Sequence, residues 1–183
     1  MSDLLALEGV ACVRGGRLLF EGLSLRLGPS EAALVRGPNG AGKSSLLRLA
    51  AGLLRPAAGT VDRAKAALAD EHLALDERQK LAAALAFWVE DGRAGMAAMG
   101  LEALADVPVR MLSTGQRKRA ALARVAASGA PLWLLDEPAN GLDADGLARL
   151  DAAMAAHRAA GGAILAASHQ KVALDGAQIV ALG

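Results

Sequence analysis

Short apolar runs alternate with glycine-bearing turns through the first part of the chain. Gly15-Gly16 and Gly28-Pro29 separate these runs, and such residues punctuate turns between β-strands. We therefore predict a meander of short strands at the N-terminus. The strands lie at residues 4–10, 18–20, 23–27 and 32–35.

From residue 46 onwards the apolar positions follow a helical spacing. Apolar residues at 46, 47, 49 and 50 share one face of a helix, which Gly52 ends. The alanine-rich region 64–110 has a composition typical of helices, and Pro108 closes it. Further helices are predicted at about 114–128 and 144–160, and strands at 132–135, 163–167 and 178–182.

This alternation of strands and helices predicts an α/β fold. Uninterrupted apolar strands are typical of a mostly parallel sheet that is covered on both faces. The N-terminal strands would add an antiparallel β subdomain, and the alanine-rich middle would be a helical insertion. The sequence shows no internal repeat or linker, so we predict one domain over residues 1–183, with a helical subdomain at about 64–128.

The charges of the chain nearly balance, with 20 Lys and Arg against 19 Asp and Glu. Nucleic-acid-binding domains usually carry a clearly basic face, so we expect no nucleic-acid partner. The single cysteine, Cys12, suits a reducing compartment, and we interpret it as a small buried hydrophobe rather than a reactive thiol. The uncharged stretches 125–135 and 159–168 are too short to span a bilayer, and the N-terminus lacks the features of a signal peptide. We therefore expect a cytosolic protein whose membrane contacts are peripheral.

Residues 37–44 read GPNGAGKS and fit the phosphate-loop pattern G-x-x-x-x-G-K-[ST]. The glycines let consecutive N–H groups point at phosphate oxygens. Lys43 would bring a mobile cation to the β- and γ-phosphates, and Ser44 would offer a hydroxyl to Mg²⁺ at a helix N-terminus. Because an apolar strand precedes the loop and a periodic helix follows it, we interpret it as a nucleotide site.

Two acidic residues follow the apolar run 132–135, at the carboxyl end of a predicted strand. Ligands bind at this end of the strands in parallel α/β sheets. Asp136 would hold Mg²⁺ beside Ser44, directly or through water, and Glu137 could polarise the water that attacks the γ-phosphate. An acidic pair after a strand is by itself an ordinary polar turn. The phosphate loop in the same chain favours the catalytic interpretation.

Two further segments are candidates for nucleotide contact. The sequence LSTGQ at 112–116 precedes a predicted helix that Ser113 can cap, and the N–H groups there would form a second anion site. One phosphate loop needs only one nucleotide, so a second anion site suggests a composite pocket between two copies of the chain. His169 follows the predicted strand 163–167, where it could donate a hydrogen bond to the γ-phosphate.

These elements, in this order, resemble the ATP-binding subunit of ATP-binding-cassette (ABC) proteins over essentially the whole chain. The resemblance implies a P-loop NTPase fold with 37–44 as the Walker A loop, 132–137 as the Walker B strand and 112–116 as the signature. It also makes Asp143 part of the D-loop and His169 the switch histidine. In that family two subunits enclose two ATPs, each between the Walker A loop of one and the signature of the other, and hydrolysis opens the dimer.

The resemblance also implies a set of roles for individual residues. Glu137 would be the general base, His169 the γ-phosphate sensor and Lys43 the electrostatic clamp. The residues implied to contact ATP form the Walker A loop with its next residue, the signature and the D-loop. They are Gly37, Pro38, Asn39, Gly40, Ala41, Gly42, Lys43, Ser44, Ser45, Ser113, Thr114, Gly115, Gln116 and Asp143.

Several segments resemble one branch of that family, the haem-handling ATP-binding export proteins of cytochrome c biogenesis. They lie at 17–25, 46–49, 55–59, 108–113 and 168–170. The resemblance implies an Mg²⁺-dependent ATPase that works as a homodimer on integral membrane permease subunits, at the cytoplasmic side of the bacterial inner membrane. Two alternatives stay open at this point: an ABC ATPase for another substrate, and a soluble nucleotide-switched ABC module.

Three positions depart from the family pattern. Arg14 stands where the family usually has an aromatic residue that stacks on adenine, and the chain has no tyrosine. Its planar guanidinium can still lie flat on a base, with weaker or less selective packing. The Q-loop glutamine, which reaches the metal, has no clear counterpart, since His72 falls nearest and Gln79 is the other candidate. Thr114 replaces a glycine of the signature.

The region 64–110 is expected to dock onto the membrane partner, and we therefore expect weak ATPase activity from the subunit alone. Its larger apolar residues are predicted to belong to the core rather than to an interface. They are Phe87, Trp88, Met96 and Met99.

Overall fold

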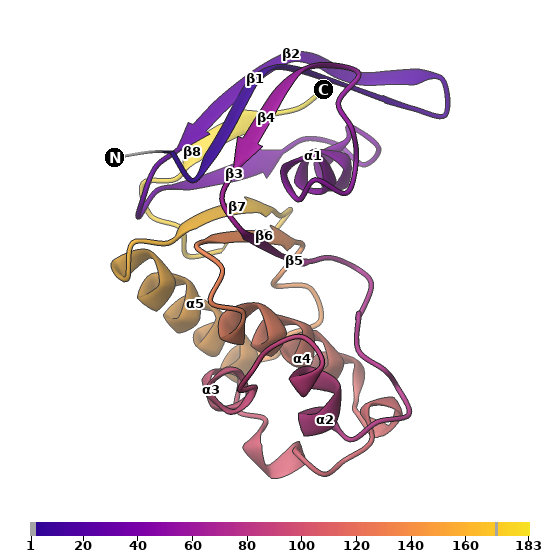
Figure 1. Cartoon of the computed structure of the whole chain (residues 1–183), viewed down its shortest axis with the longest axis vertical. Coiled ribbons are helices and arrows are strands. Elements are labelled where there is room, and N and C mark those ends of the chain that lie inside the picture. Colours follow the sequence, from indigo (N-terminus) through magenta and orange to yellow (C-terminus); the bar gives the residue numbers. More distant parts are fainter. Residues whose placement is uncertain (1–2, 171) are drawn as a thin grey trace.

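Five parallel strands form the central sheet of the computed structural model, which describes residues 3–170 and 172–183 (Figure 1). Their order across the sheet is β5-β6-β7-β3-β8, and every neighbouring pair is parallel. Parallel neighbours need crossover connections, so helices lie on the faces of such a sheet. The strands are β3 (Ala32–Arg36), β5 (Ala66–Ala69), β6 (Leu132–Asp136), β7 (Ala163–Ala167) and β8 (Gln178–Ala181).

A smaller antiparallel sheet packs over one side of the central sheet (Figure 1). In it, β1 (Leu5–Arg14) lies between β2 (Arg17–Leu27) and β4 (Ala58–Arg63). The tight turn between β1 and β2 is Gly15-Gly16, where φ is 56° and 76°. Positive φ at both central residues is typical of a type I′ hairpin turn, and glycine adopts such values at no steric cost.

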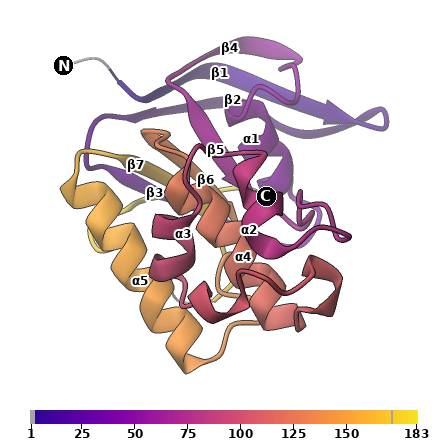
Figure 2. The same ribbon diagram turned by 60° about the horizontal axis from the view of Figure 1, so that its bottom comes forward.

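The helices divide between the two sides of the central sheet. Helix α1 packs on the side of the antiparallel sheet, whereas α4 and α5 cover the opposite side, with α2 and α3 beyond α4 (Figures 1 and 2). The helices are α1 (Lys43–Ala50), α2 (Leu81–Ala86), α3 (Arg93–Ala98), α4 (Thr114–Ala127) and α5 (Ala144–Ala159), with 3₁₀ turns at Glu102–Leu104 and Val109–Met111. Within residues 3–170 and 172–183, no helix combines the length and apolar character that a bilayer crossing needs.

The core consists of two apolar layers, one on each face of the central sheet. Strand β6 divides between them because successive side chains of a strand point to opposite faces. Leu132 and Leu134 pack with α1 and the antiparallel sheet, whereas Trp133 and Leu135 pack with α4 and α5. All five residues of β6 and all five of β7 are buried, so these strands carry no polar alternation.

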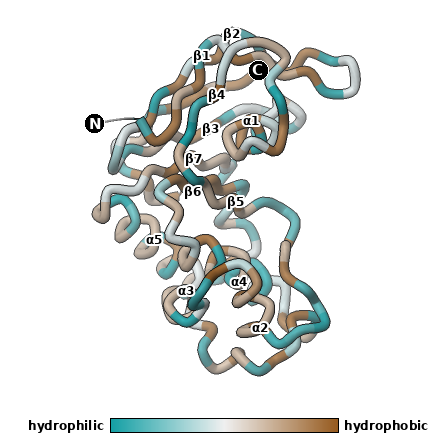
Figure 3. Tube along the Cα trace, viewed as in Figure 1, coloured by the Kyte–Doolittle hydropathy of each residue, from teal (hydrophilic) through white to brown (hydrophobic). Residues whose placement is uncertain are grey.

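The structure confirms the predicted fold class: a parallel sheet covered on both faces, with an antiparallel addition at the N-terminus. The alanine-rich region differs from the prediction, because β4 and β5 lie within residues 58–69 and only short helices follow. The sequence AALA of β5 has a high helix propensity, but pairing along β6 makes it a strand. The first helix of this region is therefore α2, which begins at Leu81, whereas the prediction had helical structure from about residue 64. The connection from β5 to α2 alternates between teal and brown stretches in Figure 3.

The larger apolar residues of the helical part separate into two groups. Met96 and Met99 are buried, as predicted. The prediction for the other two was wrong: Phe87 is 80% exposed and Trp88 48% exposed. They follow the C-terminal end of α2, a helix of only six residues. So short a helix buries one face only, and the two rings after it contact each other edge to face at the surface.

Candidate functional site

The phosphate loop connects β3 to α1 and is held by close packing around its glycines. A Cβ at Gly37 would lie 2.2 Å from the carbonyl oxygen of Leu182, just after β8. A Cβ at Gly42, where φ is 102°, would lie 3.1 Å from the ring of Phe20. Glycine is therefore required at both positions, because a side chain would force the loop away from β8 and β2.

Lys43 begins α1 and folds back across the loop. Its side chain is buried, and Nζ donates hydrogen bonds to the carbonyl oxygens of Gly37 (2.9 Å) and Pro38 (3.0 Å). The N-cap residue of α1, Gly42, offers no side-chain oxygen to the first turn. The loop thus gathers a lysine and free helix N–H groups around one concave space, which is the arrangement that binds phosphate.

Asp136 ends β6 and faces Ser44. The residue is only 8% exposed, and burial raises the pKa of its carboxyl group. The hydroxyl of Ser44 lowers that pKa, and the charge of the neighbouring Glu137 raises it further. A buried carboxylate beside a hydroxyl and a second acid is incompletely compensated, so this pair of oxygen donors favours a cation between them.

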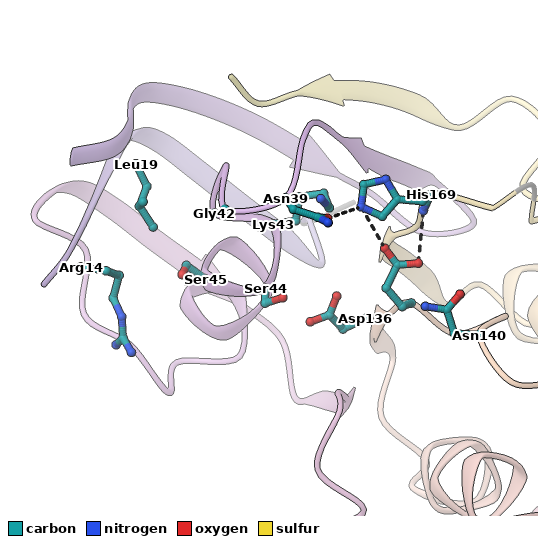
Figure 4. A pocket seen from close by; sticks show the side chains of 12 residues that line it. Arg14, Leu19, Asn39, Gly42, Lys43, Ser44, Ser45, Asp136, Asn140 and His169 are labelled. Atoms are coloured by element: carbon teal, nitrogen blue, oxygen red, sulfur yellow. Dashed lines mark hydrogen bonds and ion pairs between the residues drawn. The ribbon is translucent and has the colours of Figure 1, made fainter. Parts of the chain in front are cut away.

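Glu137 and His169 contact each other from neighbouring strand ends (Figure 4). The backbone N–H of His169 donates to Oε2 of Glu137 at 3.2 Å, and Nε2 of the imidazole lies 3.6 Å from Oε1. The same Nε2 lies 3.0 Å from Oδ1 of Asn39 in the phosphate loop. Glu137 also has a positive φ of 44°, an unusual backbone for a non-glycine residue, which turns its side chain back toward His169.

Oε1 of Glu137 is buried and has no hydrogen-bond partner among the described residues. A buried carboxylate oxygen without a partner costs free energy, and a water molecule or a substrate group is the usual complement. The backbone N–H of Glu137 donates to the carbonyl oxygen of Ala167 at 2.8 Å, which ties this turn to β7. The carboxylate is thus held at a fixed place with one acceptor unsatisfied.

These residues line one open cleft of about 530 Å³ (Figure 4). A cleft of this size suits a small-molecule ligand such as a nucleotide. Asn39 and His169 lie at one end of it, and Arg14 and Leu19 lie at the other, with Ser44 between them. The lining residues are Arg14, Leu19, Asn39, Gly40, Gly42, Lys43, Ser44, Ser45, Asp136, Glu137, Asn140 and His169.

Most candidates of the phosphate loop and both acids come together in this cleft. Gly37, Pro38 and Ala41 belong to the loop but do not line the cleft. The sequence analysis missed two lining residues, Leu19 and Asn140. Leu19 carries no chemical signal in the sequence, whereas Asn140 could have been noticed because it stands three residues after Glu137.

Lys118 is a further residue that the sequence analysis missed. It belongs to the basic face of α4, yet it is partly buried, and its Nζ donates to the backbone carbonyl of Asp136 at 3.2 Å. Burial lowers the pKa of Lys118, while the charges of Asp136, Glu137 and Asp70 raise it. A cation of the signature helix thus faces the acids of the cleft in the same chain.

The signature residues lie outside the cleft. Ser113 and Gln116 form a capping box at the start of α4: Oγ of Ser113 accepts from the N–H of Gln116 at 3.2 Å, and Oε1 of Gln116 accepts from the N–H of Ser113 at 2.8 Å. Neither they nor Thr114 and Gly115 line the cleft. Asp143 caps α5 in a similar way, with Oδ1 accepting from the N–H of Gly146 at 2.8 Å, and it too lies outside the cleft.

The two Q-loop candidates also lie outside the cleft. The side chain of His72 is 70% exposed, and its Nδ1 lies 3.5 Å from Asp70. Gln79 is exposed, and its carbonyl oxygen accepts from the N–H of Val109. The structure therefore does not bring either side chain to Ser44 and Asp136. The residue of this segment that does influence the cleft is Asp70, whose charge contributes to the raised pKa of Asp136.

Comparison with known proteins agrees with the observed fold. The family model described as ABC transporter matches residues 20–140. A solved structure described as the ATP-binding subunit of an ABC transporter superposes with a TM-score of 0.83 over 91% of this chain and 79% of that chain, at 22% identity. At that identity the likeness concerns the fold alone.

Two curated relatives narrow the family. The cytochrome c biogenesis ATP-binding export protein CcmA of Sphingopyxis alaskensis is 60% identical over 191 residues, covering 100% of this chain and 98% of that protein. The protein of the same name from Novosphingobium aromaticivorans is 58% identical over 176 residues, covering 94% of this chain and 92% of that one. The chain therefore belongs to the ABC transporter family, in the group of the cytochrome c biogenesis ATP-binding export proteins.

Proposed function

We propose that the chain hydrolyses Mg-ATP in the cleft, as the nucleotide-binding subunit of an export complex of cytochrome c biogenesis. Membership of the ABC family makes it a transport-coupled ATPase. The observation that carries the assignment of residues is the meeting of Lys43, Glu137 and His169 in one cleft. These side chains come from three separate segments of the sequence, so their proximity is a property of the fold.

The phosphate end of the cleft supplies positioning and charge. Phosphoryl transfer spreads negative charge over the γ-phosphate oxygens, and fixed positive groups stabilise that charge without reorganisation. Lys43 would leave its two loop carbonyls for the β- and γ-phosphates, and the N–H groups at the start of α1 would bind the remaining oxygens. Phosphate oxygens are stronger acceptors for an ammonium group than neutral carbonyls, so this exchange favours binding.

Glu137 would act as the general base and His169 as the γ-phosphate contact. The unpartnered Oε1 can accept a hydrogen bond from a water molecule in the cleft, which would orient that water for attack. His169 approaches the same carboxylate from its Nε2 side and also contacts Asn39 of the loop. An imidazole between the base and the loop can donate a hydrogen bond to the γ-phosphate.

Ser44 and Asp136 would hold Mg²⁺. A hydroxyl and a buried carboxylate are hard oxygen donors, and magnesium in nucleotide sites takes one or two such groups together with phosphate oxygens and water. When bound, the ion would neutralise charge on the phosphates. His72, which the resemblance suggested as a further contact, is exposed and points to Asp70, so it is not included in this set.

The role of Glu137 is tested by exchanging its carboxylate for an amide. We expect Glu137→Gln to bind ATP with unchanged affinity and to lose hydrolysis by about a hundredfold or more, since general-base catalysis typically contributes 10²–10⁴-fold. Glu102→Gln, an exposed glutamate of a 3₁₀ turn, is the matched control and should retain full activity. Equal turnover by wild type and Glu137→Gln would contradict the assignment.

We also propose that the working unit is a homodimer with ATP between its subunits. Supporting this, Ser113–Gln116 lie outside the cleft of their own chain although the start of α4 retains N–H groups that can bind an anion. Gly115 packs closely against the backbone, since a Cβ there would lie 3.1 Å from the carbonyl oxygen of Gly141. A flat, glycine-bearing helix start of this kind suits a phosphate brought by a second copy.

A mixing experiment tests the composite site. Lys43→Met removes the cation of the loop, and Gly115→Asp puts a negative charge where the partner's phosphate would bind. Each variant alone should be inactive. Mixed dimers retain one intact site, so mixing the two should restore up to roughly a quarter of the wild-type activity. Mixing that restores nothing, although the variants still associate, would contradict the composite site.

The dimer would bind integral membrane permease subunits that handle haem, at the cytoplasmic face of the bacterial inner membrane. The names of the relatives, cytochrome c biogenesis ATP-binding export proteins, support the process. The exposed rings of Phe87 and Trp88 offer an apolar contact to such a partner. The guanidinium of Arg124 lies 5.0 Å from the centre of the Trp88 ring and also donates a hydrogen bond to the carbonyl oxygen of Leu68 in β5.

Phe87→Ser is expected to weaken co-purification with membrane subunits and leave ATP binding unchanged.

A further inference from the structure

Lys118 lies on α4, two residues after Gln116, and its side chain turns toward the acids of the same chain. It is partly buried, and its Nζ donates a hydrogen bond to the backbone carbonyl oxygen of Asp136 at 3.2 Å. Lys118 does not line the nucleotide cleft but a neighbouring hollow of about 370 Å³, and Asn140 lines both spaces. The ammonium group thus lies at the carboxyl end of β6, behind the acids that the cleft presents to a ligand.

The ammonium group of Lys118 has few partners for a partly buried charge. It carries three N–H donors. Among the described residues its one hydrogen bond goes to a neutral carbonyl oxygen, and no carboxylate lies within ion-pair distance of it. The neighbouring cations of α4 differ, because Arg117 lies 3.5 Å from Glu77 and Arg119 lies 3.4 Å from Asp145. Burying an unpaired charge costs free energy, so the charge of Lys118 is offset at longer range.

Carboxylates that face Lys118 supply this longer-range compensation. Burial lowers the pKa of the ammonium group, and the charges of Asp136, Glu137 and Asp70 raise it. Asp70 already has a partner, since its Oδ2 lies 3.2 Å from a guanidinium nitrogen of Arg48. Within residues 3–170 and 172–183, no lysine or arginine forms an ion pair with Asp136 or Glu137. Lys118 is therefore placed as the counter-charge of these two acids.

A fixed cation beside a carboxylate has two opposite effects on a metal site. It favours the ionised carboxylate that a metal ion needs, and it repels the metal ion itself. The first effect acts on Asp136: burial raises the pKa of this carboxyl group, and the charge of Lys118 is among the influences that lower it. A carboxylate that is already ionised at neutral pH gains nothing more from this effect. The repulsion then decides, and a divalent ion feels it twice as strongly as a monovalent one.

We propose that Lys118 is a positioning residue that holds the carboxyl end of β6 and opposes metal binding at Ser44 and Asp136 until a nucleotide is present. The inference rests on the proposed function, which makes these two residues the Mg²⁺ ligands and Glu137 the general base. The phosphates of ATP carry several negative charges, which outweigh the repulsion by Lys118. Lys118 thereby couples occupancy by the metal ion to occupancy by the nucleotide. Its hydrogen bond keeps the turn after β6 in place for Glu137.

Mn²⁺ binding without nucleotide tests the repulsion, with electron paramagnetic resonance measuring the free ion. Lys118→Met removes the charge, and we expect it to bind Mn²⁺ about three- to tenfold more tightly than the wild type. Lys118→Arg keeps the charge and should stay within about twofold of the wild type. Lys80→Met is the matched control, because it removes a lysine that pairs with Asp106 at the surface, and it should bind Mn²⁺ as the wild type does.

The direction of this change distinguishes repulsion from a structural role. Damage to the fold would weaken the metal site, whereas removal of the repulsion strengthens it. If Lys118→Met binds Mn²⁺ no more tightly than the wild type, including no measurable binding by either chain, the inference is overturned.

Steady-state hydrolysis at saturating Mg²⁺ tests the hydrogen bond to β6. Lys118→Met should lower kcat by about five- to tenfold while KM for ATP stays within about twofold, because the displaced residue is the base and not a phosphate contact. Lys118→Arg can donate to the same carbonyl oxygen and should recover most of the wild-type kcat. An unchanged kcat in Lys118→Met, or a loss that the arginine does not restore, would overturn the positioning role.

The two measurements also separate this inference from the proposed function. The Mn²⁺ titration contains no ATP, so it gives its result even for a chain that hydrolyses nothing. A wild type without ATPase activity would overturn the proposed function. An active wild type, with a Lys118→Met variant that shows neither tighter Mn²⁺ binding nor a lower kcat, would overturn only the inference about Lys118.

Discussion

Two helices of the molecule begin at sites where an anion can bind, and they begin in opposite ways. Helix α1 starts at Gly42 in a left-handed conformation and has no side-chain cap. Helix α4 starts at Ser113 with a complete capping box, so two backbone N–H groups already have side-chain acceptors. The start of α1 lies in the cleft of its own chain, whereas the start of α4 lies outside it.

The difference shows how stability and binding are divided between the two helices. An uncapped helix start leaves N–H groups without partners, which costs stability until a ligand accepts their hydrogen bonds. A capped start stabilises the folded chain but satisfies part of its own anion-binding capacity. The first helix is therefore poised for a phosphate in the single subunit. The second has its own side-chain acceptors, and in the proposed dimer its remaining N–H groups would meet the partner's nucleotide.

The largest expected effect comes from removing the cation at the uncapped helix. Lys43→Met should weaken nucleotide binding by roughly ten- to a hundredfold, since a charge-assisted hydrogen bond contributes about 1.5–3 kcal/mol. A fluorescent nucleotide titration measures this loss. Lys65→Met, a lysine on the surface between β4 and β5, is the control that should bind normally. Unchanged affinity in Lys43→Met would mean that the loop does not hold the phosphates.

A smaller effect is expected from removing the cap of the second helix. Ser113→Ala should destabilise the chain by about 1 kcal/mol and lower Tm by roughly 2–4 °C, because the N–H of Gln116 loses its acceptor. Thermal unfolding followed by circular dichroism measures this shift, with Thr114→Ala as the neighbouring control. Nucleotide binding by the single subunit should not change. A large loss of binding would show that α4 contributes to the cleft of its own chain.

The smallest expected effect is a gain in stability at the acid that faces the uncapped helix. Burial raises the pKa of Asp136 in the folded state above its ordinary value of 3.8. At pH values between the ordinary and the raised pKa, the folded state therefore binds more protons than the unfolded state. The stability of the wild type therefore falls as the pH rises through that window. Asp136→Asn should raise stability by about 0.5 kcal/mol at pH 7.5, the low end of the gains that single stabilising substitutions give.

That gain should shrink as the pH falls through the window and vanish below pH 3.8, where the carboxyl group becomes neutral in both states. Unfolding of wild type and variant across the pH range measures the difference. Asp62→Asn, an exposed aspartate of β4, should show no such gain at neutral pH. A loss of stability in Asp136→Asn at neutral pH would mean that the ionised carboxylate is fully compensated by its neighbours.

Much of the fold and the phosphate side of the cleft could be predicted from local patterns. A phosphate cradle needs glycines and a lysine next to one another in the chain, so the loop before α1 is visible in the sequence. The apolar strand before Asp136 and Glu137 is visible in the same way, and the structure brings both acids to Lys43 and His169. Their roles in catalysis stay proposals that the variants above test.

The predictions that failed concern residues whose state depends on a distant partner. Strand β5 has the composition of a helix, and pairing with β6 overrides that propensity. Phe87 and Trp88 are apolar, but their exposure depends on where a short helix ends. Lys118 drew no prediction, because only the packing of α4 against the sheet brings its Nζ to the backbone carbonyl of Asp136.

The order of residues along this chain thus specified the chemistry that consecutive residues can perform: the phosphate loop, the paired acids and the capping residues of α4. Packing decided which of these groups share a cleft. The contact of Glu137 with His169 joins residues that lie far apart in sequence, and so does the cleft wall that Ser45 shares with Arg14 and Leu19. Their proximity follows from strand order and hairpin geometry, and the free energy that holds it comes from burying the apolar layers on both faces of the central sheet.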